Sequence, residues 1–298
     1  MGSKYWKIHL EISNICNLQC SFCPEVVRAK KLVDVGQFAH AIEQVAPLTK
    51  TVTLHLMGDP LVHPKLGELV EICARAGLQI FLVTNGVLLR EKEAELLLHP
   101  AFRQICFSLH SFPDNFPEKD PSVYLDRIFR FTEMAFEKRP TLFINYRLWN
   151  LAQPRGQRSS NLEILERIEK HFGVTLPREV DVRERKNHIV KNYLSLHFDT
   201  EFVWPAMDLP VLGEQGVCYG LKSHFGVLVD GTVVPCCLDK EGAIPLGNLH
   251  DTPLRDILAG PRAQALLAGF RRGELVEPLC QRCQYIERFE TPLAAQSI

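Results

Sequence analysis

The sequence predicts an α/β fold built on a parallel sheet. Short apolar runs alternate with amphipathic segments along residues 1–200. The runs expected to form strands are Ile8–Ile12, Thr51–Met57, Gln79–Val83, Arg103–Leu109, Leu142–Leu148 and Tyr193–Phe198. The segments expected to form helices are Val35–Leu48, Lys65–Ala76, Glu91–Leu98, Tyr124–Glu137 and Asn161–His171. Repeated βα units of this length imply parallel strands with right-handed crossovers, and periodicity alone leaves open a closed barrel or an open sheet.

The local signals follow the chain in order. In the first helical segment Phe38, Ile42 and Val45 recur at helical spacing, and the second such segment is followed by Gly77, a common helix terminator. Residues 201–216 lose all periodicity and are expected to be a linker. A hairpin follows, with strands at Phe225–Val229 and Thr232–Val234 joined by the turn Asp230-Gly231. These signals predict a first domain at 1–200, a linker at 201–216 and a small second domain at 217–298.

Composition limits the class of protein. The chain has 298 residues, of which 46% are hydrophobic and 23% charged, with a net charge of -1. This length fits one large α/β domain with a small appendage. No apolar run approaches the ~20 residues that a membrane span needs, and the start of the chain shows no signal peptide, so we expect a cytoplasmic protein. The near-neutral charge argues against nucleic-acid binding through a broad basic surface.

Three cysteines follow the first expected strand. Cys16, Cys20 and Cys23 form a C-x3-C-x2-C triplet. Three thiolates can hold three irons of a [4Fe-4S] cluster and leave the fourth iron open to a small molecule. Zinc is the weaker alternative, because structural zinc sites normally take four ligands from two cysteine or histidine pairs. A disulfide framework is also disfavoured, because it requires an oxidising compartment.

The triplet resembles the signature loop of the radical S-adenosylmethionine (SAM) superfamily. In that family SAM chelates the open iron, and the fold is a partial (β/α)6 barrel, which the six expected strands fit. The resemblance implies reductive cleavage of SAM to methionine and a 5'-deoxyadenosyl radical, which removes a hydrogen atom from a substrate. It also implies an electron donor such as flavodoxin or ferredoxin.

Further segments carry the same resemblance. Met57-Gly58-Asp59-Pro60 is similar to the G-G-E-P segment that meets the SAM amino group, with Met in place of the first Gly and Asp in place of Glu. Polar residues after later strands are implied to approach the SAM ribose, sulfonium and carboxylate. Arg147 is expected to share a face of its strand with Asn145, where it pairs with the SAM carboxylate or with substrate, or else is a charge on the outer face. The residues that the resemblance assigns to SAM are Phe22, Met57, Gly58, Asp59, Asn85, Ser108 and Arg147.

A second cysteine set lies in the C-terminal part. The spacing Cys218-x12-Gly231-x4-Cys236, followed at a distance by Cys280-x2-Cys283, resembles the opening of the SPASM module and the closing pair of its shorter relative, the twitch domain. This resemblance implies one auxiliary [4Fe-4S] cluster held by Cys218, Cys236, Cys280 and Cys283, hence two clusters in the protein. Zinc remains an alternative for this set.

Three other cysteines receive a separate interpretation. Only one of the adjacent Cys236 and Cys237 is expected to reach the auxiliary cluster, because adjacent strand residues face opposite sides; the spacing from Gly231 favours Cys236, and Cys237 is the alternative. Cys73 and Cys106 are expected to be core residues.

The substrate is not indicated by the sequence. A fully ligated auxiliary cluster suits an electron acceptor or conduit, so we expect an oxidoreductase that acts on a small molecule, a peptide or an RNA nucleoside. His110, Glu201 and Trp204 are candidate substrate contacts from position alone. Basic residues between 155 and 191 are expected to form a solvated face, with phosphate binding as the less favoured alternative. The competing class is a non-catalytic zinc or electron-transfer protein.

Overall fold

The computed structural model describes residues 4–289. The chain divides into two compact units. Of the described residues, 4–16, 24–80 and 202–289 form the first unit, and 17–23 and 81–201 form the second. The strand β3 (Gln79–Thr84) carries the chain across the division.

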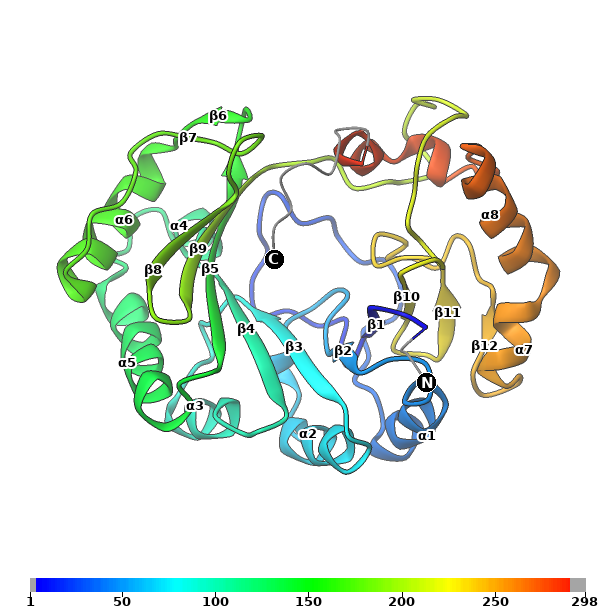
Figure 1. Ribbon diagram of the computed structural model, residues 1–298, viewed down its shortest axis with the longest axis horizontal. Helices are drawn as coiled ribbons and strands as arrows, with labels where there is room; N and C mark the ends of the chain where they lie inside the picture. Colours follow the sequence, from blue (N-terminus) through cyan, green and yellow to red (C-terminus); the bar gives the residue numbers. More distant parts are fainter. Residues whose placement is uncertain (1–3, 290–298) are drawn as a thin grey trace. The chain divides into compact units, whose positions relative to one another are not determined.

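The first unit combines both ends of the chain. Its strands lie in the order β12-β11-β10-β1-β2, where β10, β1 and β2 are parallel and β10, β11 and β12 are antiparallel. The bounds of these strands are β1 Lys7–Leu10, β2 Thr51–Thr53, β10 His224–Val227, β11 Thr232–Val234 and β12 Gly247–Asn248. The helices are α1 Val35–Val45, α2 Leu66–Arg75, α7 Leu254–Ala259 and α8 Pro261–Arg272, with short 3-10 turns η1 Pro60–Val62, η2 Cys280–Arg282 and η3 Gln284–Arg288 (Figure 1).

Apolar packing and local capping explain these elements. Ile8 of β1 lies in register with Val52 of β2 and Phe225 of β10, and all three side chains are fully buried. The helix α1 begins at its N-cap Asp34, whose carboxylate accepts a hydrogen bond of 2.7 Å from the amide of Gly36. Burial of the apolar face of α1 then holds the helix against the sheet.

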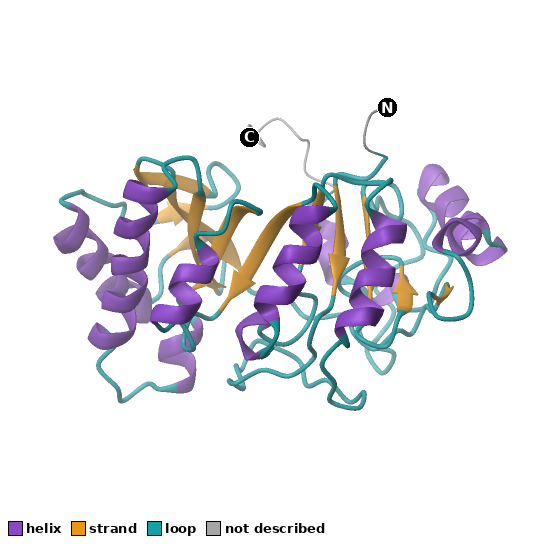
Figure 2. Cartoon of the chain, turned by 90° about the horizontal axis from the view of Figure 1, so that it is seen from below, coloured by secondary structure: helices purple, strands orange, loops and turns teal. Residues whose placement is uncertain are grey.

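The second unit repeats the βα pattern. Its strands lie in the order β4-β5-β9-β8, with β4, β5 and β9 parallel and β8 antiparallel at the edge. The strand bounds are β4 Phe102–Ser108, β5 Phe143–Leu151, β8 Asn187–Lys191 and β9 Leu194–Thr200, and a separate small ladder pairs β6 Arg155–Gly156 with β7 Val180–Asp181. The helices are α3 Glu91–Leu97, α4 Ser111–Asn115, α5 Ser122–Lys138 and α6 Ser159–Phe172. Within this unit α5 and α6 lie along one side of the strands (Figures 1 and 2).

Each strand and helix expected from the sequence is present. The main differences are a shorter β2, which ends at Thr53 because residues 54–59 turn away, and elements that the periodicity did not reveal, including α4, α8 and β8. Residues 201–216 contain no helix or strand. The hairpin expected in the C-terminal part is present as β10 and β11, and β10 pairs in parallel with β1. The C-terminal part therefore packs with the N-terminal strands in one unit.

Candidate functional site

The cysteine loop leads from β1 toward α1. Cys20 and Cys23 are half-buried and Cys16 is exposed. The amide of Cys23 donates to the carbonyl of Cys20 at 3.1 Å, and the side-chain amide of Asn115 donates to Cys20 Sγ at 3.1 Å. A sulfur that accepts an amide hydrogen bond is typical of a thiolate ligand of an iron-sulfur cluster. The donor set of this loop therefore fits a cluster.

Helix α4 holds the far half of the loop within the second unit. Asn115 Oδ1 accepts from the amide of Gln19 at 2.9 Å, and Asp114 accepts from both the amide and the hydroxyl of Ser21 at 2.7 and 2.5 Å. These contacts fix the backbone around Cys20. Sequence periodicity gave no sign of α4, because the helix has only five residues.

Phe22 packs on a buried histidine. The ring of Phe22 lies 4.7 Å from that of His110, measured between centroids. His110 Nδ1 lies 3.0 Å from the carbonyl oxygen of Arg147. Burial is the main cause that lowers the pKa of His110 to about 4, and the positive charges of Arg147 and Arg158 act in the same direction. His110 is therefore neutral near pH 7.

The turn at Met57–Asp59 approaches the start of the cysteine loop within the first unit. Gly58 has φ +72°, and a Cβ atom there would lie 2.6 Å from the carbonyl oxygens of Ser13 and Ile15. Only glycine fits this conformation and this close approach. The amide of Asp59 donates to the carbonyl of Ile15 at 3.0 Å, while its carboxylate accepts from the amide of Leu61 at 2.9 Å. The carboxylate expected to face SAM is thus 2% exposed and caps the turn η1.

The remaining SAM candidates lie in the second unit. Asn85 follows β3, where its side-chain amide donates to Asn17 Oδ1 of the cysteine loop at 3.0 Å. Ser108 ends β4 and lies in register with Arg147 of β5. Tyr146, the neighbour of Arg147, contacts α5 through Thr132. Alternation along the strand therefore places Asn145 and Arg147 together on the opposite face, as predicted.

The C-terminal cysteines form a half-buried group in the first unit. Burial raises the pKa of all five thiols, and the pKa of Cys283 reaches about 11. The thiols also raise one another's pKa: the pKa of Cys236 is raised by Cys237, Cys218 and Cys280, and that of Cys283 by Cys218 and Cys237. Five neighbouring soft donors suit a metal cluster. In residues 4–289 no three such side chains already surround one point.

Cys237 belongs to the same group as Cys236. It contributes to the raised pKa of Cys218, and the positive charge of Lys7 acts on Cys237 itself. The structure therefore brings together five thiols where four were assigned. By contrast Cys73 and Cys106 are 0% exposed core residues, as predicted, and burial raises the pKa of Cys73 to about 12.

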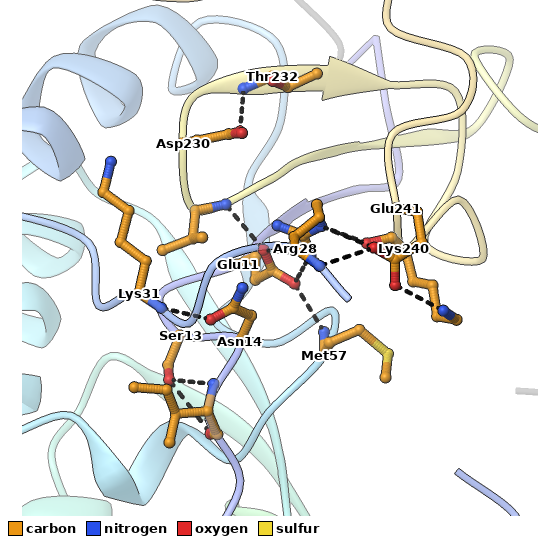
Figure 3. Close-up of polar contacts among 12 residues, drawn as sticks. Glu11, Ser13, Asn14, Arg28, Lys31, Met57, Asp230, Thr232, Lys240 and Glu241 are labelled. Atoms are coloured by element: carbon orange, nitrogen blue, oxygen red, sulfur yellow. Dashed lines mark hydrogen bonds and ion pairs between the residues drawn. The ribbon is translucent and has the colours of Figure 1, made fainter. Parts of the chain in front are cut away.

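A buried ion pair that sequence reasoning missed lies beside the Met57–Asp59 turn. Glu11 accepts two hydrogen bonds from Arg28, at 2.9 and 3.0 Å, and further ones from the amides of Met57 and Val229 (Figure 3). Arg28 also donates to the carbonyl of Lys240 at 2.7 Å. An acidic residue inside an otherwise apolar strand was the sequence signal for this site. The pair joins the segment after the cysteines to the C-terminal part.

The basic residues between 155 and 191 are mostly paired. Arg155 binds Glu179, Arg178 binds Glu169, Arg183 binds Asp181, and Lys186 binds Asp199. Of the other candidate substrate contacts, Glu201 pairs with Arg158 at 2.8 Å and Trp204 packs on Phe202. The expected solvated, charge-balanced face is therefore present.

Comparison with known families decides the identity of the chain. A profile described as the Radical SAM superfamily matches residues 10–147, and a profile described as an iron-sulfur cluster-binding domain, SPASM, matches residues 218–284. The chain belongs to the radical SAM superfamily. The two matched segments contain both cysteine sets, which supports iron-sulfur clusters and SAM as cofactors.

Curated relatives of this radical SAM enzyme match over short segments. This chain is 33% identical over 90 residues to the PqqA peptide cyclase of Gluconobacter oxydans, and the match covers 29% of this chain and 25% of the relative. It is 30% identical over 103 residues to the AdoMet-dependent heme synthase of Methanosarcina barkeri, covering 33% of this chain and 29% of that one. The chain thus aligns with less than a third of the length of these relatives.

Solved structures match over nearly the whole chain. BtrN in complex with AdoMet and 2-DOIA has a TM-score of 0.56 at 15% identity, covering 95% of this chain and 94% of BtrN. Streptococcus suis SuiB bound to the precursor peptide SuiA has a TM-score of 0.62 at 15% identity, covering 99% of this chain and 76% of SuiB. At these identities the likeness concerns the fold alone. The predicted fold class, an α/β radical SAM fold followed by a SPASM-type module, is confirmed.

Within residues 4–289, no helix combines the length and the apolar character that crossing a bilayer requires.

Proposed function

We propose that this protein is a two-cluster radical SAM oxidoreductase. Cys16, Cys20 and Cys23 would hold the SAM-binding [4Fe-4S] cluster, and the C-terminal thiols an auxiliary one of the twitch type. When bound, these cofactors supply the electron that cleaves SAM, the 5'-deoxyadenosyl radical that takes a hydrogen atom from substrate, and an acceptor or conduit for the electron that remains. The observation that carries the proposal is the presence of two separate cysteine sets, each within a matched family segment.

The protein's own contribution is to bind and orient. We assign SAM to Phe22, Met57, Gly58, Asp59, Asn85 and Ser108, and Arg147 to an anionic group of SAM or substrate. Gly58 keeps backbone close to the cysteine loop, and Asn85 is bonded to that loop through Asn17. Neutral His110 supports Phe22 without adding positive charge near a sulfonium. An electron donor such as flavodoxin or ferredoxin would serve the first cluster.

The auxiliary set is assigned as one cluster with four ligands, Cys218, Cys236, Cys280 and Cys283. Cys237 is the fifth thiol of the group. Four thiolates leave no open iron for substrate, which favours electron transfer over substrate binding. This is the feature that makes oxidation of a substrate, or oxidative bond formation, the favoured reaction class.

The test is iron content and SAM cleavage in anaerobically purified protein. We expect about eight irons per chain, as two cubanes require, and 5'-deoxyadenosine after reduction. Cys16→Ala should abolish SAM cleavage, whereas Cys280→Ala should keep part of it and lose substrate turnover. Cys106→Ala is the matched control, because it removes a buried thiol that belongs to neither set. This variant should keep the full iron content. A colourless zinc protein would contradict the proposal.

A further inference from the structure

Three alternate residues on one face of β5 carry buried polar atoms that lack a hydrogen-bond partner within the described chain. Asn145, Arg147 and Trp149 each have a buried polar atom with no hydrogen-bond partner among residues 4–289, namely Oδ1, Nε and Nε1 respectively. A buried polar atom without a partner is unfavourable, because no hydrogen bond compensates for its lost hydration. Such atoms are rare in native proteins and call for an explanation at each position. Here they recur at every second residue of one strand.

The opposite face of the same strand has no such atoms. The hydroxyl of Tyr146 lies 2.6 Å from Thr132 Oγ1 of α5. The side-chain amide of Asn150 exchanges two hydrogen bonds of 2.9 Å with Asn161 of α6. Polar side chains that face the helices are therefore satisfied within the fold. On the other face the side-chain amide of Asn145 donates to Ser195 Oγ at 2.8 Å, but Asn145 Oδ1, Arg147 Nε and Trp149 Nε1 have no partner among the described residues.

Arg147 is also a cation without a counter-ion. Its guanidinium lies 4.4 Å from the ring centroid of Trp149 and 6.0 Å from that of Phe81. It forms no ion pair with any residue between 4 and 289. A half-buried charge held between aromatic rings is costly unless an opposite charge joins it.

The acidic residues at and just after the end of the neighbouring strand β9 are already paired with basic residues. Asp199 lies 3.1 Å from Lys186 Nζ, and Glu201 lies 2.8 Å from Arg158 Nη2. The positive charge of Arg147 contributes to the lowered pKa of the His110 imidazole. An anion would therefore have to come from a ligand.

We propose that Arg147 and Trp149 form a subsite for an oxyanion, a carboxylate or phosphate group carried by the substrate. This inference rests on the proposed function, since it names the substrate class of that site. Arginine presents a planar fork of N–H donors that matches two oxygens of one anionic group. The indole N–H adds a donor of fixed direction, because the ring of Trp149 also packs edge-on against His197 at 5.3 Å.

SAM carries a carboxylate as well, so the experiment must separate the two sources. Holoprotein is titrated with succinate or inorganic phosphate at constant ionic strength set with chloride. Binding is followed by the unfolding temperature and by tryptophan emission, both with and without saturating SAM. A ligand that binds only the native state raises the unfolding temperature as its concentration rises.

The expected result has three parts. At least one of the two probes, succinate or phosphate, raises the unfolding temperature of wild-type protein saturated with SAM. The same probe changes the tryptophan emission. Arg147→Met weakens probe binding by about tenfold or more, and Trp149→Phe removes the emission change. Arg103→Met is the matched control, because Arg103 also lies over a ring, at 4.5 Å from Phe143, but at the other end of the strands. That control keeps the wild-type response.

Two further readouts decide between the alternatives. Without probe, Arg147→Met should unfold at a temperature no lower than wild type, because an unpaired cation has been removed; a marked decrease would show a structural role and overturn the inference. SAM affinity of the same variant, measured by equilibrium dialysis, shows whether Arg147 also holds the SAM carboxylate. A loss of SAM affinity together with no probe response would assign Arg147 to the SAM carboxylate. Protein that cleaves SAM but shows no probe response contradicts this inference and leaves the proposed function intact.

Discussion

Arg28 donates to both carboxylate oxygens of Glu11, at 2.9 and 3.0 Å. The Glu11 side chain is 0% exposed and that of Arg28 is 13% exposed. Glu11 also accepts from the amides of Met57 and Val229, so one carboxylate fixes the end of β1, the turn that contains Gly58, and the β10–β11 connection. The pair therefore connects the end of β1, the Gly58 turn and the C-terminal hairpin within a single unit.

Arg28→Met should destabilise the protein strongly. The substitution leaves the Glu11 carboxylate buried without its cation, and breaking a buried pair in this way costs about 3–5 kcal/mol. The matched control is Arg155→Met, which breaks a pair whose side chains are 71% and 62% exposed. That change should cost no more than about 1 kcal/mol. Denaturant unfolding under anaerobic conditions measures both.

The loss in Arg28→Met should also depend on pH. Burial raises the pKa of Glu11 above its ordinary value, and the hydrogen bonds from Arg28 oppose this rise. Without Arg28 the folded-state pKa rises further, so the native state holds a proton that the unfolded state has released. Stability then falls as pH rises above the ordinary carboxyl pKa. A destabilisation equal at pH 5 and pH 8 would contradict this account, and Glu11→Gln in the same background should recover part of the loss.

Gly58→Ala and Gly77→Ala form a matched pair. Both glycines have positive φ, +72° and +69°, but a Cβ at Gly58 meets two backbone carbonyls at 2.6 Å whereas one at Gly77 meets nothing within 4 Å. Gly77→Ala should cost only the left-handed strain of about 1–2 kcal/mol and should bind SAM normally. Gly58→Ala should displace the cysteine loop and weaken SAM binding, measured by equilibrium dialysis. Equal SAM affinity in the two variants would argue against a role for the turn.

His110 should make the wild-type protein less stable in mild acid. Burial lowers the pKa of the folded-state imidazole to about 4, below the ordinary value of 6.5. As pH falls from 6.5 toward 4 the unfolded state binds a proton that the native state refuses, so stability declines by up to about 1.4 kcal/mol per pH unit. His110→Gln removes this contribution. The free energy of unfolding of the wild type minus that of His110→Gln should therefore be smaller at pH 5.5 than at pH 7.5. An equal difference at the two pH values would contradict this prediction.

The fold was largely predictable because its signals are local. The apolar stripe of α1, the Gly77 terminator and the Asp230-Gly231 turn each depend on neighbours in sequence, and each is present. The two cysteine sets were recognised from their spacing together with the family resemblance, and both lie in the matched segments. The sequence does not reveal pairing over long distances, such as that of β10 with β1, because either strand fits any parallel sheet.

Individual site contacts were harder to predict. Asp59 was assigned to SAM from the resemblance, and no sequence signal indicated that its carboxylate also caps a turn, a local bond that Pro60 at the first helical position favours. Glu11 gave a recognisable signal, but its partner Arg28 lies on an irregular segment. The unsatisfied face of β5 depends on which atoms find partners in three dimensions, so no sequence pattern announces it.

Asn115→Ser tests whether the second unit tunes the first cluster. The side-chain amide of Asn115 donates to Cys20 Sγ at 3.1 Å, and hydrogen bonds to cysteine sulfur stabilise the more negative, reduced state of an iron-sulfur cluster. The variant should keep its iron but show a more negative reduction potential in a spectroelectrochemical titration. Ser21→Ala is the matched control, because it removes a hydrogen bond between the same loop and Asp114 of α4, changes no charge and leaves the contact to sulfur in place. An unchanged potential in Asn115→Ser, or an equal shift in both variants, would show that the Asn115 contact only supports the loop.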